Sequence, residues 1–99
     1  MGGVKPDAIL DEIRRRFLRE VDRLLAPIHE ADPLPLVVVG VEHWITLFRE
    51  VTRLGREVIA TVPGSFATAS SAELARKVAP LVQDWRRSER TRMLEALDR

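Results

Sequence analysis

Two short apolar runs joined by one amphipathic segment constrain the fold most strongly. The run LVVVG, residues 36–40, is apolar at every position and rich in β-branched side chains. Such a run is typical of a strand that helices cover on both faces, as in a parallel sheet. The run EVIATV, residues 57–62, has a similar character and is followed by Pro63 and Gly64. Because parallel strands need a crossover connection, the segment between the two runs is expected to supply a helix.

That segment predicts a helix from Glu42 to Leu54. Its apolar residues recur at helical spacing, Gly40 supplies the turn before it, and Gly55 stands where a C-terminal cap is expected. The sequence therefore predicts a right-handed parallel βαβ unit over residues 36–62.

Long amphipathic segments flank this unit on both sides. The first begins at Pro6, carries apolar residues at three- and four-residue spacing, and is expected to end or kink at Pro27. The second follows a capping box formed by Ser70 and Glu73, and Pro80 inside it predicts a kink. The predicted fold is α/β in the order α-β-α-β-α. Its βαβ unit is packed by a long N-terminal helix and a kinked, long C-terminal helix.

The predicted sheet is small for an independent domain. Two parallel strands leave two unpaired edges, so we expect either a homodimer that shares a sheet or a missing domain partner. The 99 residues correspond to one domain or a piece of one. We interpret residues 1–6 as a flexible N-terminus or a remnant of cloning, and residues 7–99 as a single domain fragment.

Composition excludes several classes of function. The chain has 16 basic and 15 acidic residues, a net charge of +1, so its overall charge gives no strong signal for nucleic acid. It contains no cysteine, which excludes disulfides and thiolate chemistry. No apolar run approaches the ~20 residues of a membrane helix, and the N-terminus lacks the apolar core of a signal peptide. We therefore expect a cytoplasmic protein without a membrane partner.

The residues that commonly perform catalysis or bind metals lack suitable spacing. His29 falls in an expected proline-bounded loop and His43 in the first turn of a helix, with no further ligand in register. The serines have no histidine partner for a nucleophilic triad. We therefore predict no catalytic residue, no metal site and no cofactor.

The turns that follow the two strands are candidates for ligand contact. A strand, Gly40 and a helix resemble a phosphate-binding turn, although a dinucleotide fingerprint needs more glycines and Glu42 adds negative charge. The loop formed by Gly64, Ser65 and Phe66 is the second candidate, since loops after strands often bind ligands. A small-molecule or nucleotide site at these turns is one alternative function. The other aromatic residues fall on apolar helix faces and predict core packing.

A cluster of arginines near the C-terminus is the better candidate for contact with RNA phosphates. Its members are Arg86, Arg87, Arg90 and Arg92. The arginines of the first helix instead alternate with acidic residues, namely Asp11, Glu12, Glu20 and Asp22. Pairs such as Glu12 with Arg16 predict exposed helix salt bridges.

Three stretches of the chain are most informative when they are taken together and in order. They are RRRFLREVDRLLAPI, PLVVVGVEHWITLFREVT and VPGSFATASSAELARKVAPLV. The landmarks are the strand ending at Gly40, the Phe-Arg-Glu of residues 48–50, the turn at Gly64 and the Ser-x-x-Glu-Leu of Ser70–Leu74. As an ordered set they resemble the bacterial branch of the archaeo-eukaryotic release-factor family, relatives of the release factors and of pelota. The resemblance covers roughly Ile9 to Leu97 and lies in the second half of the family's middle domain.

The resemblance implies a translation-related module that associates with the ribosome or with tRNA. In the release factors, a Gly-Gly-Gln loop before the helix corresponding to Asp7–Leu25 helps water attack the peptidyl-tRNA ester. Here Gly2 and Gly3 are followed by Val4, so we assign no catalytic role. We expect residues 7–99 to be a non-catalytic, release-factor-like middle-domain fragment of a larger or truncated protein. A protein-interaction or homodimerisation module that uses exposed strand edges is the other alternative.

Overall fold

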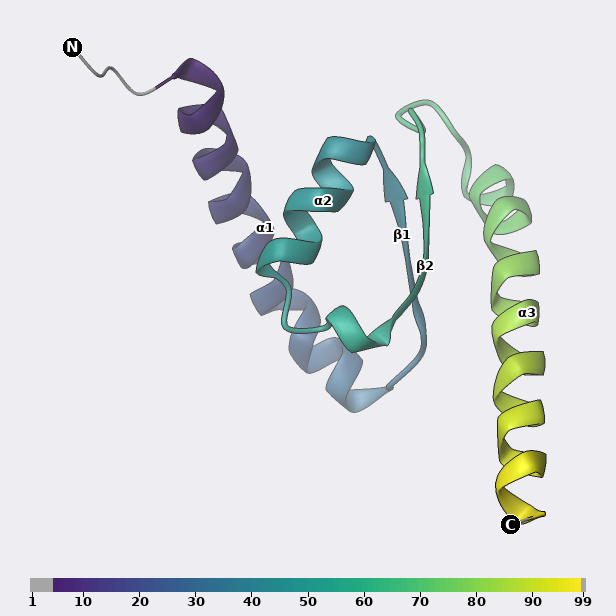
Figure 1. Cartoon of the computed structure of the whole chain (residues 1–99). Helices are drawn as coiled ribbons and strands as arrows, with labels where there is room; N and C mark the ends of the chain where they lie inside the picture. Colours follow the sequence, from purple (N-terminus) through teal and green to yellow (C-terminus); the bar gives the residue numbers. More distant parts are fainter. Residues whose placement is uncertain (1–4, 99) are drawn as a thin grey trace. The chain divides into compact units, whose positions relative to one another are not determined.

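A computed structural model describes residues 5–98 of the chain. Its elements follow in the order α1 (Pro6–Ala31), β1 (Leu36–Gly40), α2 (Glu42–Val51), the 3-10 helix η1 (Gly55–Glu57), β2 (Val58–Pro63) and α3 (Ser71–Leu97), as Figure 1 shows. The predicted α/β fold with the order α-β-α-β-α is confirmed. The stretch Gly2 to Val4, where the release factors' Gly-Gly-Gln loop was sought, lies outside the described residues.

The chain divides into two compact units. The first extends to Ser65 and holds α1, β1, α2 and β2, and the second begins at Phe66 and holds α3. The assignment of residues 1–6 to a flexible or artificial N-terminus, of which 1–4 lie outside the described residues, stays a prediction. The assignment of residues 7–99 to a single domain also stays a prediction.

The two strands pair in parallel, as predicted, from Leu36 opposite Val58 to Gly40 opposite Pro63. The N–H of Gly64 donates a hydrogen bond of 2.8 Å to the carbonyl of Gly40, just beyond the last pair. Gly64 has a φ of 153°, a conformation that side chains with a Cβ rarely adopt. Glycine at this position therefore lets the chain turn directly at the end of the sheet.

The core of the first unit is small and centres on α2. Leu47 is only 1% exposed and forms a cluster with Leu18, Phe48 and Val58, which brings together α1, α2 and β2. All five residues of β1 are half-buried rather than buried. The expectation that helices cover both faces of β1 is therefore not met within residues 5–65.

A buried carboxylate connects α1 to the segment that follows α2. The side chain of Asp22 is 3% exposed and accepts hydrogen bonds from the hydroxyl of Thr52 and, at 3.2 Å, from the backbone N–H of Arg53. The Nε of Arg53 lies 3.5 Å from the same carboxylate. The interpretation of Asp22 as one of the exposed, alternating charges of the first helix was wrong.

This connection also decides where α2 ends. The helix stops at Val51, because Thr52 takes an extended conformation with φ −72° and ψ 141°. The Thr52 hydroxyl also accepts a hydrogen bond of 3.0 Å from the N–H of Leu54. Gly55 therefore begins η1 and does not cap α2, so the prediction of a helix that reaches Leu54 was wrong.

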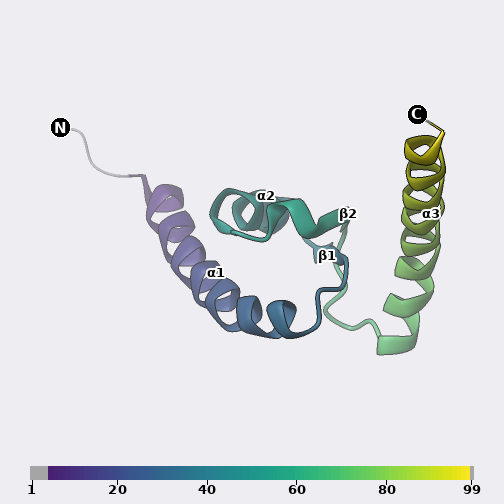
Figure 2. The same ribbon diagram turned by 90° about the horizontal axis from the view of Figure 1, so that it is seen from below.

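The first helix, which was predicted to end or kink at Pro27, does not end there but continues to Ala31. Pro27 is exposed, which lets water satisfy the carbonyl that a proline leaves unpaired one turn earlier. Figure 2 shows α1 following a curved path, as expected of a helix that contains proline. His29 consequently lies in the last turn of α1 and not in a loop, with its Nε2 2.9 Å from the carbonyl oxygen of Leu34.

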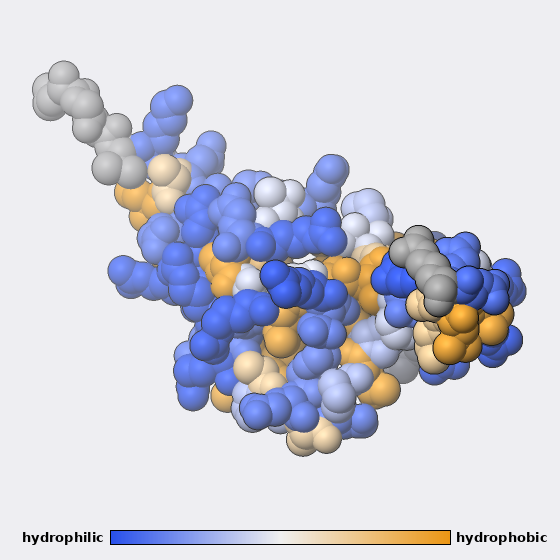
Figure 3. All heavy atoms as spheres, turned by 60° about the horizontal axis from the view of Figure 1, so that its bottom comes forward, coloured by the Kyte–Doolittle hydropathy of each residue, from blue (hydrophilic) through white to orange (hydrophobic). Residues whose placement is uncertain are grey.

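The second unit is dominated by a single helix. The Ser70 Oγ accepts a hydrogen bond of 3.1 Å from the N–H of Glu73, which confirms the predicted cap. The helix then continues through Pro80 to Leu97, and no residue along its described length is buried. Figure 3 shows hydrophobic residues at the surface of α3 near its C-terminal end, where Met93, Leu94 and Leu97 are exposed.

Replacement of Asp22 by Ala tests the role of the buried carboxylate. The variant leaves the Thr52 hydroxyl and the Arg53 N–H without their acceptor, so we expect the free energy of unfolding to fall by about 1–3 kcal/mol. Urea unfolding followed by circular dichroism measures this change. Glu20→Ala is the matched control on the same helix, since Glu20 is exposed and pairs only at the surface with Arg23. Equal losses in the two variants would contradict the account.

Candidate RNA-contact surface and apolar groove

Three of the four predicted phosphate-contact arginines share one side of α3. Successive residues of an α-helix turn by about 100°, so Arg86, Arg87 and Arg90 lie within about 100° of one another. Arg92 lies roughly 120° or more from each of them. The continuous helix therefore brings three of the predicted residues together and separates the fourth.

Ion pairs distinguish these arginines further. Arg87 lies 3.6 Å from Asp84 and Arg92 lies 3.1 Å from Glu89, and both arginine side chains are about three-quarters exposed. Among residues 5–98, no ion pair involves Arg86 or Arg90. Both are exposed, so their guanidinium groups are available for the bidentate contacts that phosphate accepts.

Sequence reasoning missed a further arginine on this side. Arg76 stands eleven positions before Arg87, which corresponds to about 20° around a continuous helix. It is exposed, and its Nε donates a hydrogen bond of 3.4 Å to the carbonyl of Ala72. The spacing of eleven residues between Arg76 and Arg87 was the signal that could have revealed this arginine. A kink at Pro80, as the sequence predicts, would instead have turned Arg76 away from the C-terminal arginines.

Phe66 lies near a cationic group in the second unit. The Nζ of Lys77 is 5.8 Å from the centroid of the Phe66 ring, within the range of a cation–π interaction. An aromatic ring beside a basic side chain is a combination that also suits stacking on a base next to its phosphate. Gly64 and Ser65 belong to the first unit, so the predicted three-residue loop contact stays a prediction.

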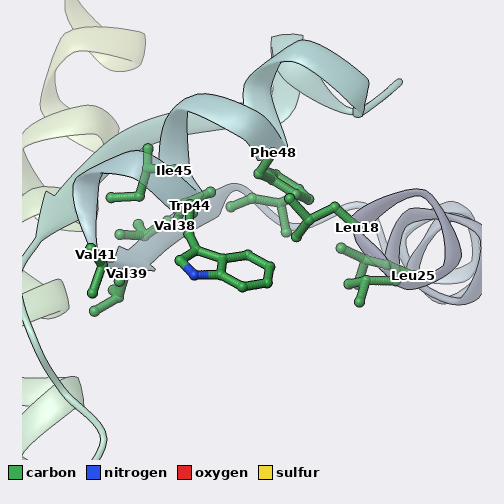
Figure 4. A pocket seen from close by; sticks show the side chains of 12 residues that line it. Leu18, Leu25, Val38, Val39, Val41, Trp44, Ile45 and Phe48 are labelled. Atoms are coloured by element: carbon green, nitrogen blue, oxygen red, sulfur yellow. The ribbon is translucent and has the colours of Figure 1, made fainter. Parts of the chain in front are cut away.

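An apolar groove of about 470 Å³ lies in the first unit. Its walls are all five residues of β1, together with Val41 and side chains of α1 and α2. Figure 4 shows the Trp44 ring inside this space, with Leu18 and Leu25 of α1 on one side and Val38 and Val39 of β1 on the other. The twelve described residues that line the groove carry no charge. A groove of this kind does not suit a phosphate, and the alternative of a nucleotide site at Gly40 receives no support.

Charged and aromatic side chains join α1 to α2 beside the groove. The Nε2 of His43 lies 2.7 Å from the Asp11 carboxylate, and Arg14 lies 2.8 Å from the same group. Arg14 also lies 5.8 Å from the centroid of the Trp44 ring. Phe17 meets Trp44 edge to face with 6.0 Å between ring centroids. His43 is exposed, and its partner on α1 could not be read from the sequence because Asp11 lies 32 positions earlier in the chain.

Hydrogen bonds from His43 and Arg14 lower the pKa of Asp11 below its ordinary value of 3.8.

No group of three or more potential metal ligands occurs among the described residues. None of the helices in that part of the chain is long and apolar enough to cross a membrane.

Replacement of His43 by Ala removes the first cause of this shift. We expect the pKa of Asp11 to rise toward 3.8, which an NMR titration of its carboxyl carbon measures. Because the pKa is lower in the folded state, the pair stabilises the fold above the unfolded value and loses this effect as the pH falls through the folded pKa. His29→Gln, at the other histidine, should leave the Asp11 titration unchanged. An unchanged Asp11 pKa in His43→Ala would show that the contact does not form in solution.

Comparison with known proteins gives a match over the whole chain. Residues 1–99 match bacterial archaeo-eukaryotic release factor family 3, and no significant match was found among curated proteins. The matched region contains every landmark on which the resemblance rested, from the strand ending at Gly40 to the capped start of α3. The chain therefore belongs to bacterial archaeo-eukaryotic release factor family 3, and this membership points to a translation-related module.

Proposed function

We propose that this chain is a non-catalytic module that binds the RNA of the ribosome or of tRNA through α3. The observation that carries the proposal is the position of Arg86, Arg87 and Arg90 on one exposed side of a helix in a release-factor-family chain. Guanidinium groups bind phosphate oxygens bidentately. Contacts of this kind supply most of the affinity for RNA without reading its sequence.

The local arrangement of charge matters more here than the total. A net charge of +1 gives the whole chain little attraction for RNA, whereas adjacent arginines on one helix side act on the same stretch of backbone. Arg76 extends the surface toward the start of α3. Phe66, beside Lys77, would add stacking on an exposed base. Arg92 pairs with Glu89 on a different side of the helix, so we expect it to contribute least to RNA binding.

The proposal assigns the chain binding and no reaction of its own. It places the protein in the cytoplasm, where ribosomes and tRNA are found. That the chain acts as part of a larger or truncated protein is a further part of this proposal.

A second candidate function is protein interaction through exposed strand edges. The observation that favours it is the sheet of only two strands in residues 5–65, because each strand then has an edge that can pair with a further strand. The second function does not exclude the first, since RNA contact is assigned to α3 and strand pairing to the first unit.

Single charge reversals at Arg86 and Arg92 test the RNA contact with equal changes of net charge. We expect Arg86→Glu to weaken the binding of fluorescently labelled tRNA at least fivefold. It should also reduce the slope of log K against log salt by about 1, because one phosphate contact is lost. Fluorescence anisotropy over a salt series measures both quantities.

Arg92→Glu is the matched control, and we expect it to change the affinity much less. Circular dichroism of both variants verifies that α3 is intact. Equal weakening by the two reversals would mean that net charge alone governs binding, and the assigned surface would then be wrong.

A further inference from the structure

One edge of β1 is unpaired among the described residues. β1 pairs only with β2 in the two-stranded sheet, so the N–H and C=O groups of its other edge have no strand beside them. Proteins usually protect such an edge with a lysine, a proline or a charge that points inward. Residues Leu36 to Gly40 include none of these, so the edge is competent to pair with another strand.

The apolar groove lies along this strand. All five residues of β1 line it and no residue of β2 does. Leu18, Leu25 and Trp44 form its other walls (Figure 4). An extended segment beside β1 would therefore gain backbone hydrogen bonds from the strand and apolar contacts from the two helices, which is the geometry of strand addition.

Part of the groove's apolar lining is exposed, and Phe17 extends this surface beyond the groove. Val41 is 52% exposed, Trp44 is 36% exposed and its neighbour Phe17 is 59% exposed. The two aromatic rings alone leave on the order of 200 Å² accessible. That is about a quarter of the ~800 Å² that each partner buries in a standard interface. Pairing of two strands would bury backbone and further groove-wall surface in addition to these rings.

The charges nearest the groove select against a charged occupant. Asp11 is already paired with both Arg14 and His43, and the groove itself carries no charge. RNA or a strongly charged peptide would find no counter-charge here. The occupant must instead be extended, apolar and able to offer its own free strand edge. The β1 strand of a second copy meets all three requirements.

We propose that two copies of this chain pair along β1, antiparallel and related by a two-fold axis, in a four-stranded sheet of order β2-β1-β1-β2. The two-fold axis makes the contact isologous, so that each β1 occupies the other copy's groove. This inference rests on the second candidate function, strand-edge interaction, and names the edge and the partner. It requires nothing of α3.

A substitution at Val41 can weaken the pairing of two copies without unfolding the chain. It lies in the groove and occupies the N-cap position of α2, where no side-chain cap bond is present. Asp at an N-cap favours helix formation, so Val41→Asp should keep the folded chain intact while placing a charge in the interface. Val41→Thr is the matched control, because it also caps the helix but adds no charge.

Light scattering and sedimentation equilibrium on the full chain measure the association. We expect a dimer for the natural chain and for Val41→Thr, and at least tenfold weaker dimerisation for Val41→Asp. Hydrogen exchange at high and low protein concentration locates the contact. Dimerisation should slow exchange at Leu36–Gly40 more than at Val58–Pro63. Binding of labelled tRNA by Val41→Asp should match that of Val41→Thr.

Three results would overturn the proposal in different ways. A dimer with slowed exchange only at Val58–Pro63 would keep strand-edge interaction but show that the wrong edge was chosen. A dimer that Val41→Asp leaves intact, but that Met93→Asp on α3 dissociates, would place the contact outside the first unit. A monomer at all concentrations would mean that a second copy is not the occupant, and would also remove the support for homodimerisation through strand edges.

Discussion

The carboxylate of Asp22 is the interaction on which the first unit depends. It is buried, yet it lies on a helix whose other charged residues are at least partly exposed, and it is joined to Thr52 and Arg53 about thirty positions further along the chain. A buried charge is stable only when hydrogen bonds replace the water that it has lost. Here those bonds come from the residues that end α2 and direct the chain toward β2. The same carboxylate therefore holds α1 against the end of α2. It also fixes the point at which the chain leaves α2 and turns toward β2.

The small core leaves much of the chain's apolar surface uncovered. Leu47, Leu18, Phe48 and Val58 form the only buried cluster among the described residues, and β1 remains half-buried along one wall of a groove. An exposed apolar surface beside an unpaired strand edge suits contact with another chain. The charged surface of α3 has the opposite character, since Arg76, Arg86 and Arg90 have no ion-pair partner in residues 5–98. The groove of the first unit is thus apolar, whereas the arginine surface of α3 is cationic.

The sequence predicts the parts of this structure that depend on local chemistry. The β1 bounds follow from a β-branched run that ends at Gly40, and the start of α3 follows from Ser70 and Glu73, because strand preference and helix capping act within a few residues. The end of α2 could not be predicted, since it depends on a hydrogen bond between Thr52 and a helix that lies thirty positions earlier. The pairing of His43 with Asp11 was missed for the same reason. Membership of the release-factor family was recognisable from an ordered set of landmarks, none of which is specific alone.

Of the two candidate surfaces, the arginine surface was partly predictable from the sequence and the groove was not. The arginine cluster was visible as a local concentration of charge, whereas the alignment of Arg76 with it became clear only with a helix that continues through Pro80. The groove could not be predicted, because it depends on how α1 and α2 pack beside β1.

Co-sedimentation with bacterial ribosomes over a salt series tests the central claim, RNA association through a small arginine surface, most directly. We expect the chain to pellet with ribosomes at low salt. With about three phosphate contacts, log K should fall with log salt at a slope of roughly −2 to −3. A chain that stays in the supernatant at every salt concentration, or that pellets without dependence on salt, would contradict it.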